Sequence, residues 1–100
     1  MDIVFDDHEL AVKYDEGIDD IINWEDVIRL TGYKVYSYPG EVTFLVFTTN
    51  KGERLEVSDE MSGWLQLLGN LPKIFACLPG WEDKLTEMQP DEDDVTVWEK

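Results

Sequence analysis

The chain has 100 residues, a formal net charge of −15 and a hydrophobic fraction of 43%. This length predicts a single domain over residues 1–100, and the 12% of aromatic residues can supply a folded core. The negative charge opposes direct binding to nucleic acid or to an anionic membrane surface, because both kinds of binding depend on Lys and Arg. The sequence has neither a basic, apolar leader nor a segment long enough to span a bilayer, so we expect a cytoplasmic protein.

The first third of the chain predicts short strands around an irregular segment. Residues 3–5 and 9–14 have the composition of short strands. The segment 15–24 is ambiguous, because Gly17 and its like-charged acids weaken a helix. Three isoleucines nevertheless have helical spacing: Ile18, Ile21 and Ile22. We expect an irregular segment that leads into a strand, followed by a long strand over residues 27–38.

The middle of the chain predicts a β-hairpin. Residues 42–48 are β-branched and aromatic on both alternating faces, which is typical of a central strand covered on both sides. Residues 50–52 form a turn with Gly at the position that needs a positive φ. Residues 53–57 then alternate polar and apolar side chains, as a half-buried strand does.

The last part of the chain predicts helices. Apolar residues at three- and four-residue spacing over 61–71 indicate an amphipathic helix, with Ser58 or Asp59 as the cap and Pro72 just after the end. Residues 81–88 favour a second, short helix, and residues 95–98 an edge strand. Residues 89–94 are expected to form a flexible acidic segment. The predicted fold class is α+β, an antiparallel sheet of about five to six strands packed by one main C-terminal helix.

The acidic residues concentrate at the two ends of the sequence. Residues 1–26 carry a charge of −9, residues 27–58 carry +1 and residues 59–100 carry −7. Self-repulsion at this charge destabilises a compact chain, whereas it speeds the encounter with a basic partner. We therefore expect the negative charge to serve recognition.

Motifs for catalysis are missing from the sequence. It contains no nucleophile elbow, zinc-binding spacing or phosphate-cradling glycine loop. Adjacent carboxylates are frequent, but adjacency does not place two of them in a cleft with separated pKa values. The acids of residues 91–94 lack the spacing of an EF-hand loop, and Cys77 lies in an apolar run typical of a buried thiol. We expect no enzymatic activity, no cofactor and no metal.

The candidate site combines acids with aromatic residues. Carboxylates pair with Lys or Arg of a partner, and Trp and Tyr supply contact area. Trp24 has an alternative interpretation as a core residue. The predicted partner-binding residues are Asp15, Glu16, Asp19, Asp20, Trp24, Glu25, Asp26, Tyr36, Tyr38, Asp59 and Glu60.

Several short runs carry a resemblance that covers roughly residues 18–88. The runs are residues 22–28, Tyr33-Lys34, residues 60–65 and Leu71-Pro72. Their layout resembles small bacterial proteins of pleckstrin-homology-like appearance, with a strand-rich sheet and a C-terminal helix. The resemblance implies no catalytic residues.

In size, acidity and lack of active-site residues, the chain also resembles the immunity proteins of contact-dependent growth inhibition and other polymorphic toxins. That resemblance implies an inhibitor that binds a basic toxin domain, a nuclease, one to one and covers its active site. The alternative is an acidic DNA mimic or a regulatory adaptor without catalytic activity. A mimic would carry acids spaced like phosphates along an extended face.

Overall fold

A computed structural model describes residues 1–17 and 19–100, so the helical spacing that involves Ile18 lies partly outside the described residues. Within them the chain forms seven strands, two α-helices and one 3₁₀ helix. Their order is β1 (Asp2–Phe5), β2 (Glu9–Lys13), β3 (Asp20–Asn23), η1 (Trp24–Asp26), β4 (Val27–Ser37), β5 (Gly40–Thr49), β6 (Arg54–Ser58), α1 (Trp64–Ile74), α2 (Trp81–Glu87) and β7 (Val95–Glu99).

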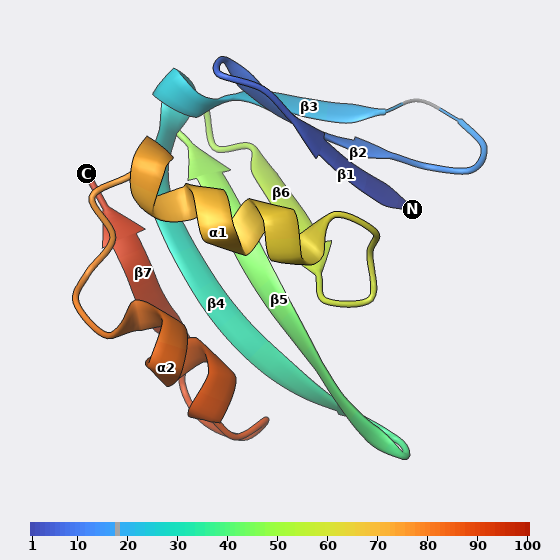
Figure 1. Cartoon of the computed structure of the whole chain (residues 1–100), viewed down its shortest axis with the longest axis vertical. Coiled ribbons are helices and arrows are strands. Elements are labelled where there is room, and N and C mark those ends of the chain that lie inside the picture. The colour runs from blue at the N-terminus through green and yellow to red at the C-terminus, as the bar shows by residue number, and fades with distance from the viewer. Residues whose placement is uncertain (18) are drawn as a thin grey trace.

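The strands form two antiparallel sheets (Figure 1). The first has the order β1-β2-β3 and the second the order β6-β5-β4-β7. The α+β class is confirmed and the expected five to six strands come close to the seven of the described chain, but these strands form two sheets and not one. The reason is η1, whose single turn separates β3 from β4 and redirects the chain into the second sheet.

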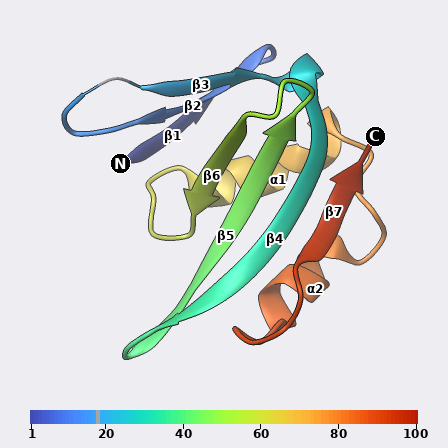
Figure 2. The ribbon, with the colours of Figure 1, turned by 180° about the vertical axis from the view of Figure 1, so that it is seen from behind.

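The predicted hairpin is confirmed as β5 and β6, with Leu45 opposite Val57 and Phe47 opposite Leu55. The predicted edge strand is also confirmed, because β7 pairs with β4. Both α-helices lie on the same face of the four-stranded sheet, and Figure 2 shows no described helix over its other face. The side chains of Val42 and Val46 on that other face of β5 are nevertheless buried, so the expected burial of both faces is confirmed at these positions without a covering helix. On the open face the rings of Tyr33 and Phe44 stack at 4.9 Å.

The main helix begins and ends later than its sequence suggests. It starts at Trp64, after Gly63 with φ 96°, so Ser58 and Asp59 do not cap it. The residues before it are held elsewhere, since Ile3 N–H donates to the Ser62 carbonyl at 2.7 Å. The helix also continues through Pro72 to Ile74. A proline inside a helix costs about 3 kcal/mol, which the burial of neighbouring apolar side chains offsets.

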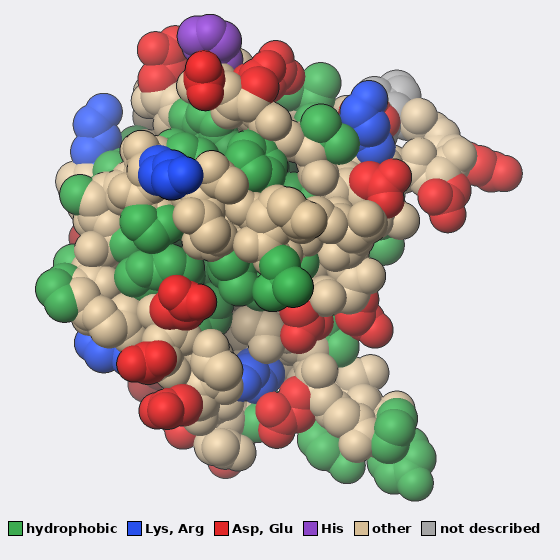
Figure 3. Space-filling model, viewed as in Figure 1, with side chains coloured by type: hydrophobic (Ala, Val, Ile, Leu, Met, Phe, Trp, Pro, Cys, Tyr) green, Lys and Arg blue, Asp and Glu red, His purple; other side chains and the backbone are tan. Residues whose placement is uncertain are grey.

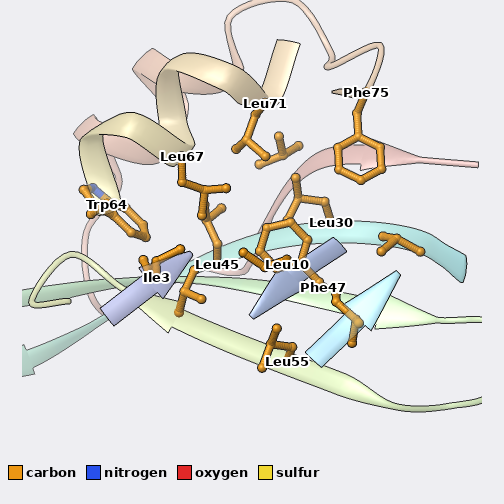
Figure 4. Packing of buried hydrophobic residues seen from close by; sticks show 14 of the residues in the cluster. Ile3, Leu10, Leu30, Leu45, Phe47, Leu55, Trp64, Leu67, Leu71 and Phe75 are labelled. Atoms are coloured by element: carbon orange, nitrogen blue, oxygen red, sulfur yellow. The ribbon is translucent and has the colours of Figure 1, made fainter. Parts of the chain in front are cut away.

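Both sheets and both helices contribute to a single hydrophobic core. Figure 4 shows side chains of α1 pointing at residues of both sheets. Leu67 and Leu71 on α1 are fully buried, as are Leu10 on β2 and Leu45 on β5. Neither described helix is long and apolar enough to cross a membrane. Residues 89–94 contain a turn closed by Glu92 N–H on the Gln89 carbonyl at 3.1 Å, and their flexibility remains a prediction.

Candidate protein-binding face

Three connections reach the same side of the molecule. They are the β2–β3 connection, the β6–α1 loop and the tip of the β4–β5 hairpin, at the right of Figure 1 and at the left of the reversed view in Figure 2. Figure 3 shows carboxylates at the upper part of this side, an indentation in the outline below them, and apolar side chains at the lower end. We call this side the acidic–tyrosine face and define it by Asp15, Glu16, Asp19, Asp20, Tyr36, Tyr38, Asp59 and Glu60.

Two acids of the β2–β3 connection form only long ion pairs with other residues of the described chain. Lys13 Nζ lies 3.7 Å from Asp19, and the Met1 amino group lies 3.9 Å from Asp15, whose side chain is 96% exposed. The Tyr14 hydroxyl donates a 2.6 Å hydrogen bond to Asp20, which raises the pKa of the Tyr14 phenol because the charged form would face a carboxylate. Long ion pairs in water contribute little, so the carboxylates of Asp15 and Asp19 stay available to a partner.

The β6–α1 loop holds two exposed acids on a fixed backbone. Asp59 N–H donates to the Thr43 carbonyl at 3.0 Å, and Met61 N–H donates to the Ser58 carbonyl at 3.1 Å. Among the described residues, neither Asp59 nor Glu60 has an ion pair. Their carboxylates therefore point to solvent from a defined position.

The tip of the β4–β5 hairpin exposes aromatic side chains. Tyr36 is 67% exposed and Tyr38 is 86% exposed. The strands remain paired up to the turn, with Tyr36 opposite Glu41 and Ser37 opposite Gly40. An aromatic side chain that is mostly exposed in its own chain can bury its ring against a partner. This tip is the main exposed aromatic feature of the described chain.

Three predicted residues lie away from this face. Trp24 is a core residue, 7% exposed, so the expectation that it forms a surface anchor is wrong. Its ring packs against Phe47 at 5.9 Å and Phe75 at 5.7 Å, because η1 turns the indole inward. Glu25 is exposed beside it, and Asp26 lies next to the β5–β6 turn, where its carbonyl accepts Asn50 N–H at 2.8 Å.

The negative charge is not neutralised within the described chain. Only four ion pairs form there, and they involve four of the 23 acids. The Arg29 side chain pairs closely with Glu99 at 2.9 Å, while the other three distances are 3.7–3.9 Å. The surface therefore keeps a strong negative potential.

A separate hollow of about 770 Å³ lies at the other end of the first sheet. The β1–β2 turn, the start of η1 and the end of α1 form its walls. The sequence gives no signal for this hollow, because its walls come from three separate segments. One of them is the last turn of α1, which lies beyond the expected end of the helix at Pro72. The lining residues are Phe5, Asp6, Asp7, His8, Asn23, Trp24, Glu25, Asn70, Lys73, Ile74 and Phe75.

Metal binding and thiol reactivity are the two other kinds of chemistry to consider in the described residues. No group of three or more His, Cys, Asp or Glu side chains in that part of the chain could hold a metal ion. Cys77 is half-buried, and burial raises the pKa of its thiol, so the thiol stays protonated and is a poor nucleophile.

A comparison with models of protein families gives no match. Comparisons with curated proteins and with solved structures give no significant match either. The resemblances to pleckstrin-homology-like proteins and to immunity proteins therefore stay predictions from the sequence.

Proposed function

We propose that this chain is a non-catalytic inhibitor that binds a basic protein domain through the acidic–tyrosine face. The proposal rests on one observation about two parts of the chain that extend from the molecule. The acidic β2–β3 connection and the tyrosine-bearing hairpin reach the same side of the molecule, with Asp59 and Glu60 between them.

The two ends of the face have different roles in this proposal. The carboxylates attract a basic partner over distances comparable to the Debye length, about 8–10 Å at moderate salt, and set its orientation. Tyr36 and Tyr38 then bury their rings against the partner, where aromatic anchors commonly contribute most of the affinity. The indentation between the two ends gives a convex partner room to enter.

The partner proposed is the nuclease domain of a toxin, bound one to one. A nuclease site is lined with Lys and Arg that hold phosphates, and carboxylates can pair with the same cations. An inhibitor that occupies such a site needs no chemistry of its own. A net charge of −15 that the chain does not neutralise internally supports this choice.

The test uses a toxin domain encoded next to the gene of this chain, as expected for an immunity protein. If the neighbouring gene encodes a large secreted protein with a basic C-terminal domain, that domain should bind this chain one to one in isothermal titration calorimetry and lose its nuclease activity. Glu60→Lys should weaken binding by about tenfold or more, because it replaces a partner for a cation with a like charge. Tyr38→Ala should weaken it by a similar factor.

Matched controls separate the face from the charge of the whole molecule. Glu53→Lys makes the same charge change at the β5–β6 turn, which lies at the opposite end of β5 from the tyrosines, and should alter affinity much less. Leu78→Ala removes an exposed apolar side chain outside the face. Equal losses from Glu60→Lys and Glu53→Lys would contradict the proposed face. Failure of the basic domain to bind at low salt would contradict the proposed partner.

A further inference from the structure

The hollow beside Trp24 has a rigid aromatic wall. The Trp24 ring meets Phe5 edge-on at 6.4 Å and Phe75 edge-on at 5.7 Å. The indole Nε1–H donates to the Asp6 carbonyl at 2.8 Å, and the Trp24 backbone N–H donates to the His8 carbonyl at 2.9 Å. These bonds fix the indole against the β1–β2 turn, so the wall exists before any ligand arrives.

The rim of the hollow is acidic. Asp6, Asp7 and Glu25 line it, against Lys73 as the one Lys or Arg among the lining residues. The Asp6 carboxylate already accepts two backbone N–H groups. Asp7 and Glu25 are exposed, and neither has an ion pair among the described residues. Figure 3 shows this end at its top, where carboxylates and the histidine lie above an apolar patch and Lys or Arg side chains lie beside and below it.

The aromatic side chains, exposed carboxylates and side-chain amides that line the hollow together suit one kind of group. A guanidinium is flat and weakly hydrated, so it can lie against an aromatic wall. Its N–H groups can pair with two carboxylates at once, and the amide oxygens of Asn23 and Asn70 can accept the remaining ones. A compact ammonium keeps its hydration shell more tightly and gains less from such a wall.

We propose that the hollow beside Trp24 binds a guanidinium group, held between the aromatic wall and the carboxylates of Asp7 and Glu25. Two sources carry this group: an arginine side chain of another protein, and a small free guanidinium compound. This site lies apart from the acidic–tyrosine face, at the opposite end of the first sheet, and it does not depend on the function proposed for that face.

The test follows the indole N–H signal of Trp24 in ¹H–¹⁵N NMR spectra of the whole chain. Trp24→Phe assigns that signal among the four tryptophans. Titration with agmatine and, separately, with a blocked Gly-Arg-Gly peptide should shift it saturably, with dissociation constants of about 0.1–10 mM. 1,4-Diaminobutane, which like agmatine carries two positive charges but has no guanidinium, should bind about threefold or more weakly than agmatine. Tighter binding of agmatine than of the peptide would assign a free compound, and the reverse order would assign a protein arginine.

Variants locate the binding. Asp7→Asn combined with Glu25→Gln should weaken agmatine binding by about tenfold, and Lys73→Gln should strengthen it by about twofold to threefold. The matched control is Glu53→Gln, an exposed acid outside the hollow, which should leave binding unchanged. All these side chains are exposed, so the variants should fold, as the same spectra would verify. Shifts that NaCl reproduces at equal ionic strength, or shifts unchanged in the double variant, would overturn the proposal.

Discussion

The ammonium group of Lys34 donates a 2.8 Å hydrogen bond to the backbone carbonyl of Thr86, and so joins β4 to the last turn of α2. The Lys34 side chain is only 7% exposed, and its second neighbour is Glu41 at 3.9 Å. The last carbonyls of a helix lack intrahelical donors and carry partial negative charge, which a cation offsets. This contact fixes the base of the hairpin that carries Tyr36 and Tyr38.

Lys34→Met should therefore destabilise the fold. Methionine fills the buried volume but leaves the Thr86 carbonyl without its donor, which costs about 1–3 kcal/mol of unfolding free energy. Urea denaturation followed by circular dichroism measures the change. Lys51→Met removes the same charge at an exposed turn and should change stability by less than about 0.5 kcal/mol. Equal stabilities of the two variants would show that the buried contact contributes nothing.

Gly32 on β4 leaves room for α2 to pack. A Cβ at this position would stand 2.3 Å from Leu85 Cδ1, and Leu85 is only 2% exposed, so it cannot swing into solvent. Gly32→Ala should cost about 1–3 kcal/mol in urea denaturation. Gly40→Ala should have little effect, because its added methyl group would meet nothing within 4 Å.

A double-mutant cycle checks that Leu85 is the cause. Leu85→Ala alone should cost about 2–5 kcal/mol by opening a cavity. The pair Gly32→Ala with Leu85→Ala should cost clearly less than the two single changes together, because the added methyl enters space that the leucine has vacated. Additive losses would mean that Gly32 is needed for its backbone and not for its size.

At Gly69, unlike at Gly32, we expect that replacing the glycine by alanine raises the stability of the fold. It lies in α1, and a Cβ there meets nothing within 4 Å. Gly69→Ala should raise the unfolding free energy by about 0.5–1 kcal/mol, because alanine favours the helix and restricts the unfolded chain. Thermal denaturation measures the gain. A loss of stability would contradict the open space around this position.

The sequence predicted those elements whose cause is local. The β5–β6 hairpin follows from alternating side chains and a glycine turn, and both are visible in the residues themselves. The start of α1 was mispredicted because Ser58 and Asp59 look like helix caps. In the structure the Asp59 N–H donates to the Thr43 carbonyl and so continues the β5–β6 pairing past the expected cap.

In the candidate site too, features with a local cause could be predicted and features that depend on tertiary packing could not. Exposure of Tyr36 and Tyr38 could be predicted, because both residues adjoin a Pro-Gly turn at the end of a strand. Trp24 could not be placed from its acidic neighbours, since the turn of η1 sends one side chain inward while Glu25 stays exposed. The hollow beside Trp24 joins the end of α1 to segments that lie 45 to 70 residues earlier in the chain, and only the packing of α1 against the first sheet creates it.

The β1–β2 turn should make stability depend on acid pH through Asp6. His8 N–H and Glu9 N–H donate to Asp6 Oδ1 at 2.8 and 2.9 Å, and these bonds lower the pKa of the carboxyl below its ordinary value of 3.8. A lowered pKa in the folded state means a stabilising contribution that is complete above pH 3.8 and is lost as pH falls through the lower, folded value.

Asp6→Asn isolates this contribution, because an amide oxygen can still accept both N–H groups but carries no charge. The wild type should be more stable than the variant at neutral pH, and the difference should shrink as pH falls below 3.8. Urea denaturation at a series of pH values measures it. Asp6→Ala, which removes the acceptor altogether, should stay less stable than the wild type even in acid. A wild type and an Asn variant whose difference in unfolding free energy is constant with pH would contradict the assigned cause, since only a titrating carboxylate can make that difference change.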